Sequence, residues 1–328
     1  MAVMTLIESI NHTLHQEMER DGRVLVFGQD VARNGGVFRA TDGLLDRFGG
    51  QRVVDTPLSE GVIIGTAVGL AAEGLVPVPE IQFLGFSWQA FHQIAGQLAR
   101  LRYRSDGRFD CPVTVRAPFG GGVRTPELHS EALEAQFVQC PGLKVVLPAS
   151  AADAKGLLAS SIRDPDPVMF LEPLKGYRLI KGEVPEGEHL VPLGKANLVR
   201  TGDDVVLIAW SAQVEVARKA AAVLADEHGL SAGVLDLRTL VPLDIEAIVT
   251  AVEHTGRAVI VSEAPQSAGF AAEVVATICE EAFYSLEAPV ARVGGYDVPY
   301  PVGMLEEHYV PDAARVVAAA LRVCGGGA

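Results

Sequence analysis

The stretch Gly142–Pro173, GLKVVLPASAADAKGLLASSIRDPDPVMFLEP, carries the pattern that decides the fold. Two apolar runs in it, Leu143–Leu147 and Val168–Leu171, have the length of buried strands. Between them lies Ala151–Ile162, a helix-length segment that Ser150 can cap. A strand, a helix and a second strand in this order predict a βαβ unit, whose strands lie parallel in one sheet.

The same alternation runs through most of the chain. Before this stretch it predicts strands at Val24–Phe27, Leu75–Ile81 and Val113–Val115, and helices at Glu60–Glu73, Trp88–Tyr103 and His129–Val138. After it, strands are predicted at Val205–Ala209, Ala232–Asp236, Ala258–Ser262 and Val290–Val293, and helices at Val214–His228, Ile245–Thr255, Phe270–Phe283 and Asp312–Arg322. The predicted fold class is therefore α/β, with two doubly wound domains.

The alternation breaks between Glu172 and about Gly202, where the sequence is rich in proline, glycine and charge. Such a composition is typical of a connecting segment, and we expect a linker with a short hairpin. The predicted organisation is a first domain over residues 1–190, a linker over 191–204 and a second domain over 205–328.

Charge and composition limit the classes of function. The chain has 328 residues, 49% of them hydrophobic and 21% charged, which is the balance of a globular protein. Its net charge of −14 repels a phosphate backbone, so we expect no nucleic-acid partner and favour a basic protein module. The N-terminal segment lacks a basic start, and no apolar run is long enough to cross a membrane. Four widely spaced cysteines without a C-x-x-C motif are typical of reduced core thiols, so we expect a cytoplasmic protein.

Two stretches of the first predicted domain hold candidate site residues. In Asp55–Gly61, DTPLSEG, Glu60 opens an otherwise apolar helix; it could simply complement the helix dipole, or it could hydrogen-bond a ligand ring nitrogen. Glu80–Phe86, EIQFLGF, lies where α/β sheets bind ligands. Its aromatic residues could be core, or Phe86 could stack on a flat cofactor beside a polar contact from Gln82.

A third candidate lies in Phe119–Glu131, FGGGVRTPELHSE, which places His129 after a glycine-rich loop. A lone histidine is more often structural, but its position at the ligand edge also suits proton transfer. Separately, Gly61, Gly65 and Gly69 form a stripe along one predicted helix. Close packing against another helix or a subunit, or ordinary packing within the domain, would each explain these residues.

At these stretches the chain closely resembles a known family, the beta subunit of the thiamine-diphosphate-dependent decarboxylating component of 2-oxo acid dehydrogenase complexes. The resemblance runs from about Leu6 to Arg322. It is carried by VLVFGQDV (Val24–Val31), GGVFRAT (Gly35–Thr41), DTPLSE (Asp55–Glu60), VPVPEIQF (Val76–Phe83), HSEALEA (His129–Ala135), GLKVVLPAS (Gly142–Ser150), DPVMFLEP (Asp166–Pro173), VLDLRTLVPLD (Val234–Asp244) and YDVPYP (Tyr296–Pro301). EIQF and FLEP look more like the branched-chain type than the pyruvate type. The family implies a pyrimidine-binding domain followed by a transketolase C-terminal-type domain.

The resemblance also implies roles for individual residues. Glu60 matches the glutamate that hydrogen-bonds N1′ of the aminopyrimidine, and Phe86 matches the aromatic residue that stacks on this ring. Leu58 and Gln82 match neighbours of the ring. His129 matches the histidine that positions substrate and moves a proton during acyl transfer to lipoamide.

Some relatives hold a structural monovalent cation, potassium, between the strand at Val113 and the turn Ser161–Asp166. By that analogy Asp164 and Asp166 are candidate ligands. The chain departs from the family pattern beside the histidine, where Leu128 and Glu131 replace residues that are often polar and glutamine. If Glu131 contacts His129, its charge would raise the imidazole pKa.

The chain lacks the Gly-Asp-Gly segment and following Asn-Asn pair that bind magnesium and the diphosphate in thiamine-diphosphate enzymes. The family therefore implies an alpha subunit that supplies Mg2+ and the diphosphate site, in a heterotetramer with a second beta subunit. It also implies docking on the lipoyl-acyltransferase core through a basic peripheral subunit-binding domain. The leading interpretation is a branched-chain 2-oxo acid dehydrogenase; the alternatives are a pyruvate or acetoin enzyme, a transketolase or deoxyxylulose-phosphate synthase fragment, and a non-enzymatic scaffold.

Overall fold

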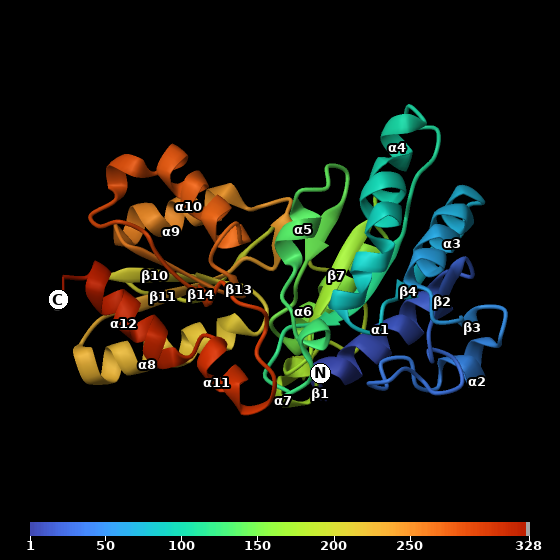
Figure 1. Cartoon of the computed structure of the whole chain (residues 1–328), viewed down its shortest axis with the longest axis horizontal. Helices are drawn as coiled ribbons and strands as arrows, with labels where there is room; N and C mark the ends of the chain where they lie inside the picture. The colour runs from blue at the N-terminus through green and yellow to red at the C-terminus, as the bar shows by residue number, and fades with distance from the viewer. Residues whose placement is uncertain (326–328) are drawn as a thin grey trace.

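The computed structural model describes residues 1–325, and they form two α/β halves that lie side by side (Figure 1). The first half is built on a seven-stranded sheet. Its strands, in spatial order, are β12 (Thr239–Val241), β6 (Lys144–Val146), β7 (Val168–Pro173), β5 (Thr114–Phe119), β4 (Val76–Glu80), β2 (Val24–Gly28) and β3 (Val53–Asp55). All neighbouring pairs are parallel except β12 with β6.

Both faces of this sheet are buried, as its apolar strands require. Val24 and Val26 of β2 face one hydrophobic cluster, which also holds residues of α1 (Leu6–Arg20) and α6 (Ala151–Ile162). Leu25 and Phe27 belong to the other cluster, together with residues of α3 (Glu60–Ala72). Alternate side chains of a strand point to opposite faces, so one run of four apolar residues serves both layers.

The second half repeats this arrangement on a five-stranded sheet. The strands, in spatial order, are β14 (Ala291–Gly295), β13 (Ala258–Pro265), β10 (Val205–Ala209), β11 (Ala232–Asp236) and β9 (Asn197–Arg200). Two helices cover each face: α9 (Ile245–Thr255) and α10 (Phe270–Glu281) on one, α8 (Gln213–His228) and α12 (Ala313–Val323) on the other (Figure 1). The predicted α/β class with two doubly wound units is thus confirmed.

The segment between the halves differs from the prediction. No hairpin forms between Glu172 and Gly202; β8 (Lys181–Val184) instead pairs antiparallel with β1 (Ala2–Thr5). Strand β9 lies inside the predicted linker 191–204 and pairs antiparallel with β11. Strands β8 and β9 each pair with a strand that is distant in the sequence. Local composition gives no sign of such pairing.

Two predicted helices are also irregular. Residues 88–103 do not form one α-helix. They lie in the 3-10 helices η1 (Leu84–Ala90) and η3 (Leu98–Arg100), the π-helical segment η2 (His92–Gln97) and the short helix α4 (Leu101–Arg104). The helix predicted at His129–Val138 splits into a 3-10 turn, η4 (Glu127–His129), and α5 (Glu134–Val138). Ser130 explains the split, because its hydroxyl donates back to the carbonyls of Thr125 and Pro126 and closes the loop before the helix starts.

The remaining elements are α2 (Leu44–Phe48), α7 (Gly176–Leu179), η5 (Phe283–Ser285), η6 (Gly303–Leu305) and α11 (Glu306–Tyr309). Across residues 1–325, we find no helix with the length and apolar character to span a membrane. The four cysteines are free; Cys111 and Cys140 are buried as predicted, whereas Cys279 is exposed and Cys324 half-buried.

Candidate active site

Glu60 is the first residue of α3, as predicted, and its side chain is only 4% exposed. Ser59 occupies the N-cap position, but its side chain makes no capping hydrogen bond. The Oε2 atom of Glu60 is buried and has no hydrogen-bond partner. An oxygen left in this state is costly unless a ligand or water satisfies it, so Glu60 fits a role as a hydrogen-bonding group for a bound ring.

An aromatic cluster joins Phe86 to His129. The His129 ring lies edge-on to Phe83 and Phe86, with centroid separations of 4.4 and 5.0 Å. Its Nδ1 atom is buried without a partner. The structure therefore brings together two predicted site residues that are 43 positions apart, and it leaves a histidine nitrogen available for a substrate or a proton.

The backbones of two turns, η1 and η4, lie in contact, and this contact places Phe86 next to His129. A Cβ atom on Gly85 in η1 would lie 2.1 Å from the carbonyl oxygen of Leu128 in η4, so only glycine permits the approach. On its other side, η1 packs against α3, where a Cβ on Gly61 would lie 3.3 Å from the Gln89 carbonyl oxygen. The turn η1 thus connects the helix that begins at Glu60 with the loop that ends at His129.

The glycine stripe on α3 has two different environments. Gly61 packs closely against Gln89, and a Cβ on Gly65 would lie 3.7 Å from the Gln93 side chain, so the packing at these two positions occurs within this half of the molecule. Nothing lies within 4 Å of a Cβ added to Gly69. Leu58, predicted to neighbour the cofactor ring, is 67% exposed, and Val62 on the next turn is 59% exposed.

Gln82 lies two residues beyond the end of β4, and its Nε2 donates to Asp30 Oδ2 at 3.1 Å. Close to it in the sheet, Arg116, Glu80 and Glu172 form an ion cluster that the sequence analysis does not predict. Arg116 is fully buried; its Nη1 donates to Glu80 at 2.8 Å and its Nε to Glu172 at 2.7 Å. Burial alone would lower the pKa of Arg116, but the charges of Glu172 and Glu80 raise it well above its usual range. Through Arg116 of β5, this cluster links the carboxyl ends of the two flanking strands, β4 and β7.

Asp164 and Asp166 lie elsewhere, in the turn before β7, whereas Gln82 follows the end of β4 in the same parallel sheet. Lys144 Nζ is 2.6 Å from Asp164 Oδ2 and 3.6 Å from Asp166 Oδ2, and Arg102 Nη1 is 2.9 Å from Asp166 Oδ1. Side-chain cations already balance both carboxylates, so they do not fit the role of potassium ligands as they stand. The potassium assignment stays a prediction without support from this geometry.

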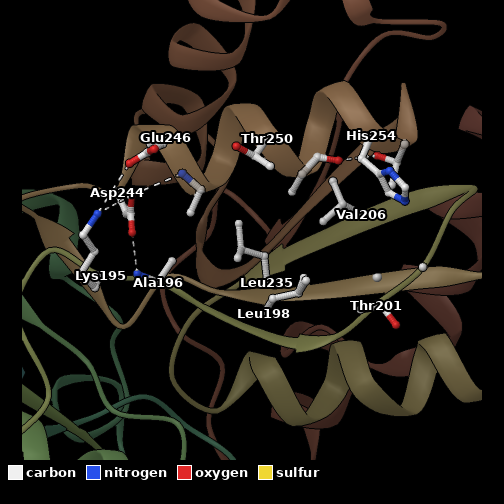
Figure 2. Close-up of a pocket in the computed structure, with 15 residues that line it drawn as sticks. Lys195, Ala196, Leu198, Thr201, Val206, Leu235, Asp244, Glu246, Thr250 and His254 are labelled. Carbon is white, nitrogen blue, oxygen red and sulfur yellow. Dashed lines mark hydrogen bonds and ion pairs between the residues drawn. The ribbon is translucent and has the colours of Figure 1, made fainter.

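A cavity of about 440 Å3 lies in the second half, between α9 and the strands β9 and β11. Figure 2 shows Leu198 and Leu235 lining its middle, with the Lys195–Asp244 pair at one end and Val206 and His254 at the other. None of the predicted site residues lines it. It is therefore separate from the candidate active site.

Comparison with known proteins decides the family. A family model described as the transketolase pyrimidine-binding domain matches residues 2–178, and one described as the transketolase C-terminal domain matches residues 194–316. The chain is 52% identical over 323 residues to the pyruvate dehydrogenase E1 component subunit beta of Bacillus subtilis, covering 98% of this chain and 99% of that protein. It is 51% identical over 317 residues to the protein of the same name from Staphylococcus epidermidis, covering 97% of each.

This chain belongs to the E1 beta subunits of the thiamine-diphosphate-dependent 2-oxo acid dehydrogenases. The family prediction is thus confirmed, but these relatives are named for pyruvate and lend no support to the branched-chain type. A solved structure described as a split-gene transketolase, an inactive beta4 tetramer, superposes on the beta subunit with a TM-score of 0.81 and covers 98% of both chains. At 23% identity, it supports the fold alone.

Proposed function

We propose that this beta subunit supplies the pyrimidine-binding half of a thiamine diphosphate site and that Glu60 is its central catalytic residue. The observation that carries the proposal is the buried, unpartnered Oε2 of Glu60 at the start of α3. That oxygen would share a proton with a nitrogen of the aminopyrimidine. When bound, the cofactor supplies an electron sink for the loss of carbon dioxide from a 2-oxo acid.

The other predicted residues would shape the same site. Phe86 offers an aromatic surface to the flat ring, and Gln82 and Leu58 would border it. The free Nδ1 of His129 would contact the substrate and move a proton when the acyl group passes to a lipoyl group. The exposed side chains of Leu58 and Val62 beside Glu60 suit a site that a second polypeptide covers.

That second polypeptide is, in this proposal, an alpha subunit. It would bring the Gly-Asp-Gly and Asn-Asn segments that this sequence lacks, and with them Mg2+ and the diphosphate. The assembly would contain two copies of each subunit. The net charge of −14 would favour docking of a basic subunit-binding domain of the lipoyl-acyltransferase core.

Pyruvate is the substrate that we now favour, because the curated relatives at 51–52% identity carry that name. A pocket that excludes extra methyl groups discriminates by roughly 10- to 200-fold per group. The tetramer reconstituted with its alpha subunit should therefore show a kcat/KM for pyruvate at least about tenfold above that for 2-oxoisovalerate or acetoin. A preference for 2-oxoisovalerate would restore the branched-chain interpretation, and no turnover of any of the three by an assembled tetramer would reject the enzymatic role.

A further inference from the structure

The loop that carries His129 is held by carboxylates of the second half of the molecule. Glu306 Oε2 accepts a hydrogen bond from the backbone N–H of Gly122 at 3.1 Å, and Glu306 Oε1 accepts one from the N–H of Arg124 at 2.9 Å. Glu263 Oε1 accepts a third from the N–H of Gly121. Three backbone donors within four residues are thus bound to side chains that lie more than 140 residues away, and the Gly122 N–H donates to the Tyr300 hydroxyl as well, at 3.3 Å.

Glu306 is itself buried and fixed. It is 3% exposed, and the hydroxyl of Tyr300 donates to its Oε2 at 2.9 Å. A Cβ on Gly121 would lie 1.6 Å from that hydroxyl, so the loop must have glycine there to reach the carboxylate. The loop also borders a cleft of about 810 Å3, which Gly122, Lys175, Glu263 and Glu306 help to line.

The loop is anchored at its other end as well. Ser130 bonds to Thr125 through their hydroxyls at 2.8 Å, and the N–H of His129 donates to the Pro126 carbonyl at 3.0 Å. The Leu128 carbonyl rests against Gly85, and the His129 ring rests against Phe86. Between these anchors the chain has few contacts of its own: Val123, Pro126 and Glu127 are exposed.

From this geometry we propose that Glu306, held by Tyr300, is a positioning residue that sets His129 for the acyl-transfer step. This inference rests on the proposed function of His129. Glu306 does not touch the histidine; it acts through the backbone of residues 122–129. A carboxylate suits the task because both of its oxygens accept, whereas a glutamine at this position would turn its NH2 group toward one of the two backbone donors.

Hydrogen exchange tests the first part of this proposal directly. In the reconstituted tetramer, Glu306→Gln should speed exchange of the Gly122 and Arg124 amides and leave that of Gly121, which is bound to Glu263, nearly unchanged. The matched control is Glu307→Gln, since the adjacent Glu307 is 62% exposed and, within residues 1–325, its one ion pair is with the Arg124 side chain. Tyr300→Phe keeps the ring but removes both the bond that fixes Glu306 and the second acceptor of the Gly122 N–H. If Glu306→Gln folds poorly, this variant should still speed exchange of the Arg124 amide, which the Tyr300 hydroxyl does not contact. Unchanged exchange of the Gly122 and Arg124 amides in a folded Glu306→Gln protein would contradict the proposed hold of Glu306 on the loop, whatever reaction the protein catalyses.

Kinetics test the second part. A displacement of about 1 Å at a reacting group can cost about 100-fold in rate. We therefore expect Glu306→Gln to slow acylation of a lipoyl domain by about 10- to 100-fold. Carbon dioxide release with an artificial electron acceptor and the affinity for thiamine diphosphate should both stay close to wild type. Glu307→Gln should change none of these quantities. Faster exchange with normal lipoyl acylation, or an equal loss in both reactions, would overturn the positioning role, while an inactive wild-type tetramer would instead reject the proposed function.

Discussion

Glu263, which accepts a hydrogen bond from Gly121 across the two halves, makes the stability of the protein depend on pH. Its carboxyl group is buried, and burial raises its pKa to about 7; the Gly121 N–H opposes this shift, and the nearby Glu134 adds to it. The folded protein therefore binds this proton more tightly than the unfolded chain, whose glutamates titrate near 4.5. The resulting stabilisation is complete below that lower value and is lost as the pH rises to about 7.

Replacing Glu263 with glutamine should remove this contribution. Between pH 5 and pH 7 the free energy of unfolding of the wild-type protein should fall relative to that of Glu263→Gln, by up to a few kcal/mol. Urea denaturation at pH 5, 6, 7 and 8 measures the difference. Other buried acids, such as Asp236, are present in both proteins and cancel in the comparison. Parallel curves for the two proteins would contradict the raised pKa.

The local sequence indicates some residues of the proposed site and misses others for a physical reason. Glu60 stands out because a carboxylate opens an apolar helix, and His129 because it follows three glycines. Glu263 and Glu306 carry no such local signal, since their partners are 142 and 182–184 residues away. Asp164 was proposed as a cation ligand by analogy, and its pairing with Lys144 became visible only in the fold.

At the scale of elements, most predicted strands and helices agree closely with the structure, whereas the helices predicted at residues 88–103 and 129–138 do not form as single helices. Periodicity identified β10, β11 and α9 with their observed bounds, because each buries a regular apolar pattern. The pattern at residues 88–103 is equally apolar, yet most of this segment folds as alternating 3-10 and π-helical turns. Those turns meet α3 on one side and the loop of His129 on the other, so tertiary contacts decide their geometry.

Two glycine substitutions test this arrangement of elements. Gly85→Ala should push η1 away from η4, because its new methyl group would otherwise lie 2.1 Å from the Leu128 oxygen. We expect a destabilisation of about 1–3 kcal/mol and a loss of activity in the reconstituted tetramer. Gly69→Ala is the matched control within α3, since a Cβ there meets nothing within 4 Å. It should stabilise the isolated chain by up to about 1 kcal/mol. Thermal unfolding measures both changes, and an equal effect of the two substitutions would contradict the contact between η1 and η4.

At the scale of the whole molecule, the two halves share a sheet. Strand β12 comes from the second half but pairs antiparallel with β6, at the edge of the first sheet. Next to it, the Leu147 N–H donates to the Arg238 carbonyl at 2.8 Å, and the Arg238 guanidinium pairs with Asp153. A three-residue strand of this kind has no periodicity to detect, so the sequence pattern predicts two domains joined by a linker and no strand exchanged between them.

Residues 1–190 should therefore not behave as an independent domain. Without β12, the edge of β6 loses its partner strand and exposes unpaired backbone groups. We expect this fragment to be insoluble or to unfold well below the intact chain in a thermal scan. Coexpression of residues 191–328 should restore solubility by returning β12 to the sheet. A monomeric fragment as stable as the full chain would show that the shared sheet contributes little.

The account depends most on the chemistry of Glu60, and one measurement addresses it directly. Carbon dioxide release from pyruvate should be compared between tetramers reconstituted with wild-type and Glu60→Gln beta subunits, after gel filtration has shown equal assembly. Loss of a proton-sharing group of this kind costs about 100- to 10,000-fold, so the wild-type rate should exceed that of the variant by at least the lower figure. A Glu60→Gln tetramer that assembles and releases carbon dioxide at the wild-type rate would contradict the central claim.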